Sequence, residues 1–154
     1  MKEPETLTEY EDAVRAGVWP ASRRVPLDEP FVNANGEIQN LLLGSCQSVA
    51  TIRSVKGSVR ANHLHVTDHH YAYVVSGRVL YFERPAGHAG IPMPAEFGPG
   101  EMFFTPPGVE HAMLFPVDTV IVTMARNVRD RAHHEDDVRR VEFVTPEIAR
   151  EFLK

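Results

Sequence analysis

Residues 57–77 read GSVRANHLHVTDHHYAYVVSG, and this stretch decides how the rest of the chain is interpreted. In a β-strand, residues i and i+2 lie on the same face about 7 Å apart, so His63 and His65 can point at one centre. The threonine and aspartate that follow favour a turn, and a second strand can then return antiparallel to the first. The stretch therefore predicts a β-hairpin that brings His70 beside the first two imidazoles.

Residues 100–115 read GEMFFTPPGVEHAMLF and supply a second motif. Proline and glycine set a tight bend ahead of a strand on which His111, Met113 and Phe115 share one face. This strand would place a fourth imidazole above an apolar wall. Imidazole nitrogen is a common ligand of transition metals, so the two motifs together predict one metal ion bound by His63, His65, His70 and His111.

The two motifs resemble those of the cupin superfamily, a glycine, His-x-His, glutamate, glycine run and a glycine, Pro-x-Gly, histidine, asparagine run. The matching positions are Gly57, His63, His65 and Gly77 in the first motif, and Gly100, Pro106, Gly108 and His111 in the second. His70 stands where the family usually has its glutamate ligand, and Phe115 where it usually has asparagine. The resemblance implies an all-β fold, a single cupin-type double-stranded β-helix, or jelly-roll barrel, with short N-terminal and C-terminal helices.

The pattern of apolar runs and turn residues agrees with this fold. We expect an N-terminal helix and extended arm over 1–30, the barrel over 31–144 and a C-terminal helix over 145–154. The predicted strands are 37–43, 46–55, 59–66, 69–76, 78–83, 101–105, 109–116, 118–126 and 138–144. Thr8 and Glu11 have the spacing of a capping box for the first helix. The charged segment 126–137 is interpreted as a solvated loop.

Replacement of the family's carboxylate by His70 changes the expected chemistry of the site. The ligand set loses a negative charge, so a bound divalent ion would hold an anionic substrate more strongly. It also becomes softer, which favours Fe, Ni, Zn, Cu or Mn over magnesium or calcium. His69 adjoins the cluster and is the alternative third ligand, although its spacing from Gly77 fits the motif less well. We assign no role to His88, His133 or His134.

Strand alternation predicts the wall of a rather apolar pocket. The expected lining residues are Ala61, Ala72, Val74, Tyr81, Met113 and Phe115. By the same alternation Arg60 is out of phase with the histidines. The sequence does not identify a catalytic acid or base.

Length and composition limit the classes of function. A chain of 154 residues is suited to one domain. The net charge of −5 and the absence of a basic stripe argue against nucleic acid, so we expect a small-molecule substrate, sugar-derived or anionic. No apolar run of about 18 residues could cross a membrane, and the start of the chain has no secretion-signal pattern, so we expect a cytoplasmic protein. The N-terminal arm and exposed edge strands favour a homodimer.

Residues 31–43, 57–85 and 103–130 also resemble the small cupins of deoxysugar and surface-polysaccharide synthesis, which include relatives of dTDP-4-dehydrorhamnose 3,5-epimerase. This resemblance implies a metal-dependent enzyme that isomerises or epimerises a sugar or nucleotide-sugar. The alternatives are a non-haem iron dioxygenase and a non-catalytic module that binds a sugar or small acid. The epimerase itself works without metal, through a His-Asp pair and a tyrosine, and no matching pair can be identified from this sequence.

Overall fold

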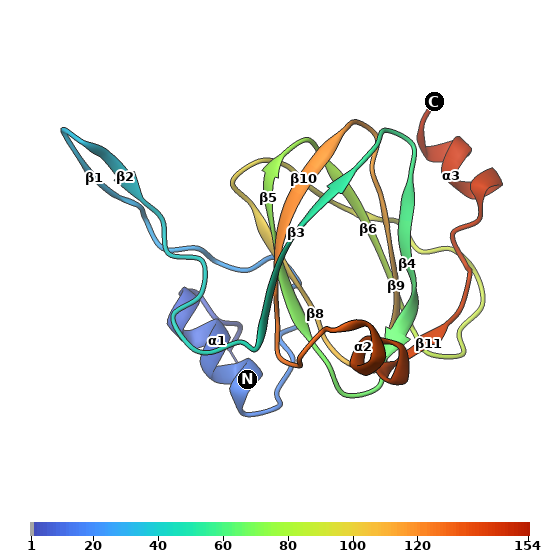
Figure 1. Ribbon diagram of the computed structural model, residues 1–154, viewed down its shortest axis with the longest axis horizontal. Coiled ribbons are helices and arrows are strands. Elements are labelled where there is room, and N and C mark those ends of the chain that lie inside the picture. The colour runs from blue at the N-terminus through green and yellow to red at the C-terminus, as the bar shows by residue number, and fades with distance from the viewer. Residues whose placement is uncertain (1) are drawn as a thin grey trace.

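Two antiparallel β-sheets face each other in the computed structural model, which describes residues 2–154 (Figure 1). One sheet has the strand order β3-β10-β5-β8, and the other has the order β11-β4-β9-β6-β7. The strands of the first sheet are β3 (Ser48–Ser54), β10 (Thr119–Ala125), β5 (His70–Ser76) and β8 (Met102–Thr105). Those of the second are β11 (Val138–Arg140), β4 (Val59–His65), β9 (Val109–Leu114), β6 (Val79–Pro85) and β7 (Ala95–Phe97). This is the predicted jelly-roll barrel.

Three hydrophobic clusters hold the layers together. The barrel interior contains Ala72, Val74, Val79, Tyr81, Phe97, Phe103, Met113, Phe115 and Ile121. Helix α1 (Leu7–Arg15) covers the outer face of the first sheet through a cluster that includes Leu7, Tyr10, Tyr71 and Phe104. Helix α3 (Pro146–Phe152) covers the outer face of the second sheet through a cluster that includes Phe82, Leu114 and Ala149. Each sheet therefore carries apolar side chains on both faces, one set in the barrel interior and the other under a helix.

A β-bulge in β4 changes the phase of that strand. Ala61 pairs with Ala112 and His63 pairs with His111, so two residues of β4 advance while β9 advances by one. Ala61 and Asn62 both have positive φ, 71° and 56°. Because neighbouring residues of β9 face opposite sides and paired residues share a face, His63 faces the interior with His111 while Ala61 faces outward with Ala112.

The N-terminal helix is confirmed, but its predicted cap is wrong. Thr6, not Thr8, precedes the first turn, and its side chain accepts a hydrogen bond from the backbone N–H of Glu9 at 3.1 Å. Glu11 instead accepts hydrogen bonds from the backbone N–H groups of Leu43 and Gly44. Thr6 and Glu9 have the same spacing as Thr8 and Glu11, so spacing alone does not decide which pair caps the helix.

A hairpin of β1 (Phe31–Asn33) and β2 (Gly36–Ile38) projects away from the barrel (Figure 1). The strand predicted over 37–43 is therefore wrong beyond Ile38, and it adds nothing to either barrel sheet. The apolar residues of the hairpin contact no core cluster; Phe31, Val32 and Ile38 are more than 60% exposed. Alternation identified a strand here but could not indicate what it pairs with.

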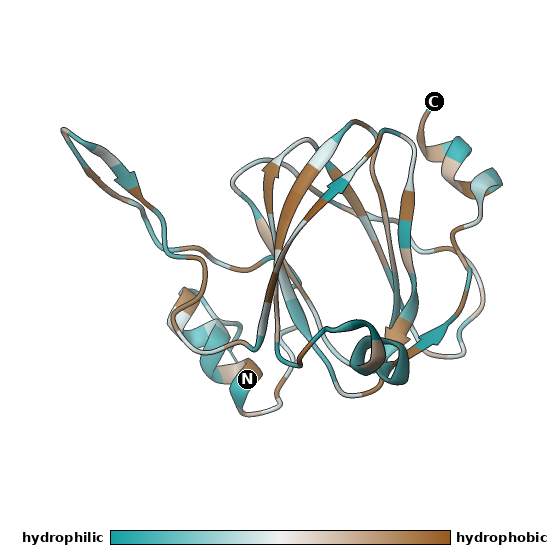
Figure 2. Cartoon of the chain, in the orientation of Figure 1, coloured by the Kyte–Doolittle hydropathy of each residue, from teal (hydrophilic) through white to brown (hydrophobic). Residues whose placement is uncertain are grey.

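The charged segment 126–137 is partly helical, which corrects the prediction of a loop. Helix α2 (Arg131–Asp137) begins after Asp130, whose side chain accepts a hydrogen bond from the N–H of His133. None of its residues is buried, so apolar periodicity could not reveal it, and Figure 2 shows it as largely hydrophilic. The strand predicted over 138–144 is only three residues long, and β7 was not predicted. The other barrel strands and α3 are confirmed within a few residues.

Within the described residues, no helix is both long and apolar enough to cross a bilayer.

The turn between β5 and β6 depends on Gly77. Its φ is +92°, and an added Cβ would clash with Thr119 Oγ1 and lie 2.5 Å from the Asp118 carbonyl oxygen. We expect Gly77→Ala to lower the free energy of unfolding by about 3 kcal/mol, from backbone strain plus the clash. Gly87→Ala is the matched control, because its φ is +80° but no atom lies within 4 Å, so only about 1 kcal/mol should be lost. Urea titrations of both variants measure this, and equal losses would contradict it.

Candidate metal centre

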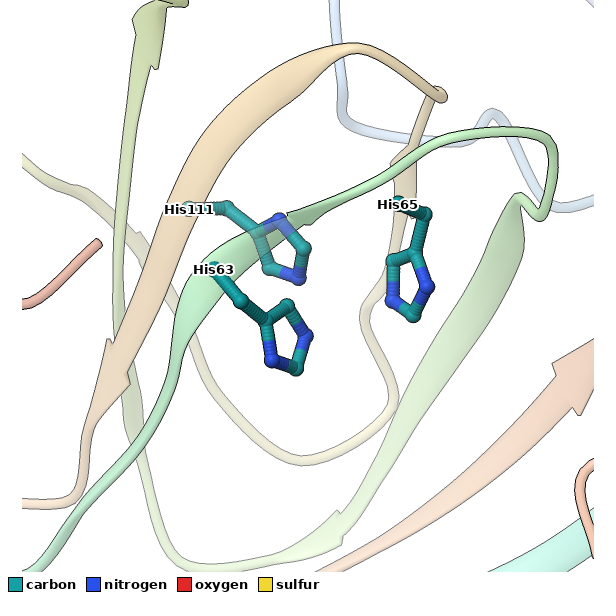
Figure 3. Close-up of side chains that lie close together, drawn as sticks. All are labelled: His63, His65 and His111. Atoms are coloured by element: carbon teal, nitrogen blue, oxygen red, sulfur yellow. The ribbon is translucent and has the colours of Figure 1, made fainter. Parts of the chain in front are cut away.

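Three imidazoles converge inside one end of the barrel. His63 and His65 come from β4 and His111 comes from the adjacent β9, and their rings point toward one another in Figure 3. The ring centroids of His63 lie 4.8 Å from those of His65 and His111, and the last two are 5.4 Å apart. One nitrogen from each ring lies within 4.8 Å of the others. This spacing fits three ligands around one metal ion.

Hydrogen bonds orient two of the three rings. His65 Nδ1 lies 3.2 Å from the Asp137 carboxylate, and His111 Nδ1 lies 3.4 Å from the Val109 carbonyl oxygen. Both partners are acceptors, so the Nδ1 atoms carry the protons and the Nε2 atoms keep their lone pairs. A carboxylate or carbonyl behind a histidine is the usual support for a metal ligand.

Two nitrogens of the cluster are buried without a hydrogen-bond partner, His63 Nδ1 and His111 Nε2. A buried polar atom without a hydrogen-bond partner lowers the stability of a folded protein. A metal ion would satisfy both lone pairs at once. The three residues therefore fit a transition metal such as Fe, Ni, Zn, Cu or Mn, whose ligand preferences include imidazole.

Burial keeps these imidazoles neutral near pH 7. Loss of solvent, followed by repulsion from His65, lowers the pKa of His63 to about 3. Loss of solvent, followed by repulsion from Arg129, lowers the pKa of His65 to about 4. Burial also holds the pKa values of His70 and His111 well below the usual range. Neutral imidazole is the form that binds a metal ion, so burial keeps these rings in the protonation state that coordination requires.

His70 faces the cluster from the opposite sheet, as expected, but it is not one of the three residues whose nitrogens lie within 4.8 Å of one another. Its ring centroid lies 5.6 Å from that of His65 and 5.8 Å from that of His111. Its Nδ1 lies 2.8 Å from a guanidinium nitrogen of Arg129. The alternative ligand His69 packs on the outer face of the sheet, with its ring 5.6 Å from Trp19 and 5.4 Å from Phe104.

Five of the six predicted pocket residues lie together in the barrel interior. They are Ala72, Val74, Tyr81, Met113 and Phe115, which belong to one core cluster. Ala61 is wrong, because the bulge turns it to the outer face. Alternation predicts that Arg60 faces away from the histidines. Because of the bulge, Arg60 instead pairs with the inward-facing Met113 and so lies on the inward face. A phase change inside a strand cannot be read from alternation.

Tyr81 connects the imidazoles to a second polar network. Its hydroxyl donates to Glu83 at 2.8 Å and accepts from Thr105 at 3.1 Å, and its ring centroid lies 6.4 Å from that of His111. Burial, followed by repulsion from Glu83, holds the pKa of Tyr81 well above 10. The phenol is therefore a protonated donor at neutral pH. Tyr81 and Glu83 also line a cleft of about 320 Å³ beside Arg23 and Arg24 of the N-terminal arm.

The segment after β10 contributes polar groups that the sequence did not reveal. Arg129 pairs with the buried Asp68, and Asp137 supports His65. The ring of His134, on α2, lies 5.9 Å from that of His63 and 5.7 Å from that of His65. The sequence gives His134 no role, because a charged run normally indicates a solvated surface. No local sequence signal indicates that this segment folds back over the end of the barrel.

Comparisons with known proteins establish the fold. No protein-family model matches the chain, and no curated protein sequence does either. Among solved structures, the sugar 3,4-ketoisomerase QdtA from Thermoanaerobacterium thermosaccharolyticum, in complex with TDP, is similar with a TM-score of 0.59 and 18% identity, over 82% of this chain and 93% of that one. A dTDP-4-dehydrorhamnose 3,5-epimerase from Sulfolobus tokodaii gives a TM-score of 0.60 and 16% identity, over 76% and 75%. The Mycobacterium tuberculosis rmlC epimerase gives 0.61 and 14%, over 79% and 69%. The chain has the cupin fold of these proteins.

The low pKa values predict acid sensitivity of the metal-free protein. Above pH 6.5 these histidines are neutral in both the folded and the unfolded protein. As the pH falls from 6.5 toward 4, His63 and His65 of the unfolded chain bind protons, whereas the same residues in the folded protein stay neutral. Each such group lowers the free energy of unfolding by about 1.4 kcal/mol per pH unit in that window. Chemical denaturation of chelator-treated protein should show this slope, and His63→Gln should reduce it by about one proton. An unchanged slope in the variant would show that His63 is not held neutral.

Proposed function

We propose that this cupin-fold protein is a metal-dependent enzyme that isomerises or epimerises a sugar or nucleotide-sugar. The observation that carries the proposal is the convergence of His63, His65 and His111 with two buried nitrogens left unpartnered. The neighbouring folds named above include a sugar ketoisomerase and two sugar epimerases, which supports a substrate of this class. Reactions of this kind move a proton at a carbon next to a carbonyl group.

In this proposal His63, His65 and His111 hold one divalent transition metal, which when bound would polarise a substrate carbonyl oxygen. The chain supplies proton transfer and orientation. The Tyr81 hydroxyl is a protonated donor beside the cluster, held by Thr105 and Glu83. The apolar side chains of the barrel interior exclude water beneath the imidazoles.

A second candidate mechanism uses the same residues without a metal. The structure pairs His65 Nδ1 with Asp137, which is the kind of His-Asp pair that could not be identified from the sequence. In such a pair the carboxylate orients the imidazole, and its Nε2 acts as a general base. Tyr81 would again serve as the acid. This candidate keeps the isomerase or epimerase activity and removes only the metal dependence.

Solvent-exchange measurements separate the candidates. TDP-4-keto-6-deoxyglucose, which is bound in another structure of QdtA, is a suitable probe. With this compound in D₂O, we expect the metal-loaded protein to incorporate deuterium next to the carbonyl, as followed by NMR. We expect His111→Gln to lose bound Zn²⁺ and at least about 100-fold of the exchange rate, because it removes a ligand without touching the His65 and Asp137 pair. Tyr81→Phe should reduce exchange while leaving the metal content unchanged, since it removes only the hydroxyl.

Three outcomes would contradict the metal-dependent proposal. Exchange that survives chelation and His111→Gln, but not Asp137→Asn, would favour the metal-free pair. Oxygen consumption in step with substrate loss, measured with an electrode, would instead identify a dioxygenase. Tight binding of the nucleotide-sugar without any exchange would indicate a binding module.

We also propose that two copies of the chain associate through the β1 and β2 hairpin. The hairpin presents Phe31, Val32 and Ile38 to solvent, and β3 is an edge strand of its sheet with Val49 65% exposed. An isolated two-stranded hairpin is marginal in water, and an exposed edge strand can pair with another chain. If the hairpin pairs with the β3 edge of a second copy, the hairpin gains a supporting strand and the β3 edge gains a hydrogen-bonding partner.

Light scattering tests this association. We expect the wild type to elute with twice the 17.3 kDa chain mass, and Val32→Arg with Ile38→Arg to give the single-chain mass, because the charges cannot be buried at an interface. Met93→Arg is the control, since Met93 is 84% exposed and lies outside the hairpin. A wild type of 17.3 kDa at micromolar concentration would refute the dimer.

A further inference from the structure

Arg129 brings a permanent positive charge to the imidazole cluster. One of its terminal nitrogens lies 2.8 Å from His70 Nδ1 and 3.3 Å from His65 Nε2. The Nε atom lies 2.7 Å from Asp68, which is 2% exposed, and the backbone N–H of Arg129 donates to Ser48 on β3. The guanidinium is thus fixed by its own ion pair as well as by the histidines.

The contact with His65 uses the lone pair that a metal would need. His65 Nδ1 is protonated toward Asp137, so Nε2 is the nitrogen left for coordination, and Arg129 donates to that atom. A guanidinium has no acceptor and stays protonated, so it cannot share the lone pair with a metal ion. The two cations are mutually exclusive at this nitrogen.

The contact with His70 fixes that ring in a form that cannot bind a metal through Nε2. Because Arg129 can only donate, His70 Nδ1 must accept, and the proton of the neutral ring lies on Nε2. A protonated nitrogen has no lone pair to offer. This explains why His70, although buried and facing the cluster, does not join the other three imidazoles.

We infer that Arg129 competes with the metal ion for His65 Nε2 and withholds His70 from the coordination sphere. This inference rests on the proposed metal function and adds to it a residue that sets metal affinity. The same charge repels any cation placed beside it. Metal uptake therefore requires the guanidinium to move off His65.

Metal titration of the full chain tests the inference. We expect Arg129→Gln to bind Zn²⁺ at least about tenfold more tightly than the wild type, measured by competition with a chromophoric chelator, because a competing charge has been removed. Co²⁺ should show a visible spectrum of changed intensity as His70 becomes available. In the wild-type background His70→Gln should alter the Zn²⁺ affinity less than threefold, whereas His111→Gln should abolish binding.

One control addresses the buried carboxylate that Arg129→Gln would leave unpaired. Asp68, Asp137 and His65 form a second group of close ligand atoms, so a free Asp68 could itself attract metal. Asp68→Asn combined with Arg129→Gln removes both charges and should keep the tighter binding. If the double variant returns to wild-type affinity, the gain came from Asp68 and the inference is wrong.

A measurement on the unaltered protein keeps the inference testable if the variants fold poorly. Long-range ¹H–¹⁵N spectra of metal-free wild type should show His70 as the Nε2–H tautomer and His65 as the Nδ1–H tautomer. The opposite tautomer at His70 would overturn the inference, as would equal Zn²⁺ affinity in wild type and Arg129→Gln, and either result would leave the metal proposal intact. Failure of every variant and the wild type to bind Zn²⁺ or Co²⁺ would overturn both.

Discussion

The bulge in β4 is the constraint on which the site depends. Before the bulge, Val59 packs against the outer cluster under α3. After the bulge, His63 and His65 face the barrel interior. The bulge is anchored by Asn62, whose side chain exchanges two hydrogen bonds of 3.1 Å with the backbone of Val144. Ala61 and Asn62 adopt positive φ, a conformation that costs free energy and that surrounding contacts must hold in place. Strain of this kind next to a cluster of imidazoles is typical of functional sites.

Burial then determines the chemistry of the imidazoles that the bulge turns inward. His65, His70 and His111 are at most 3% exposed, so the neutral ring is favoured and its lone pair is retained. Asp137 and Val109 each accept from one ring nitrogen, and Arg129 donates to two, His65 Nε2 and His70 Nδ1. These contacts decide which nitrogen of each ring carries the proton. The site is consequently specified by its outer hydrogen bonds as much as by the histidines. His65 and His70 are both buried, but their hydrogen bonds place the proton on Nδ1 of His65 and on Nε2 of His70, so only His65 has its Nε2 lone pair for a metal ion.

Much of this arrangement could be predicted from sequence, because it rests on local periodicity. The two glycine-bounded motifs identified the fold, and the i to i+2 spacing placed His63 and His65 together. Alternation failed at Ala61 and Arg60, where one inserted residue reverses the phase. It also gave no indication of Arg129, Asp137 and His134, since these lie more than 60 residues from the β4 histidines and approach them only through the path of the chain after β10. The sequence also could not indicate that His70 contacts Arg129, a partner that only the tertiary structure brings to it.

The central claim is that three imidazoles from two adjacent strands form the inner coordination sphere of one metal ion. Anomalous diffraction at the zinc absorption edge, from crystals soaked in Zn²⁺, tests it most directly. The account predicts a single strong peak about 2.0–2.1 Å from nitrogens of His63, His65 and His111, with the Arg129 guanidinium displaced from His65. A peak only at surface histidines such as His133, with the three inner rings unchanged, would contradict it.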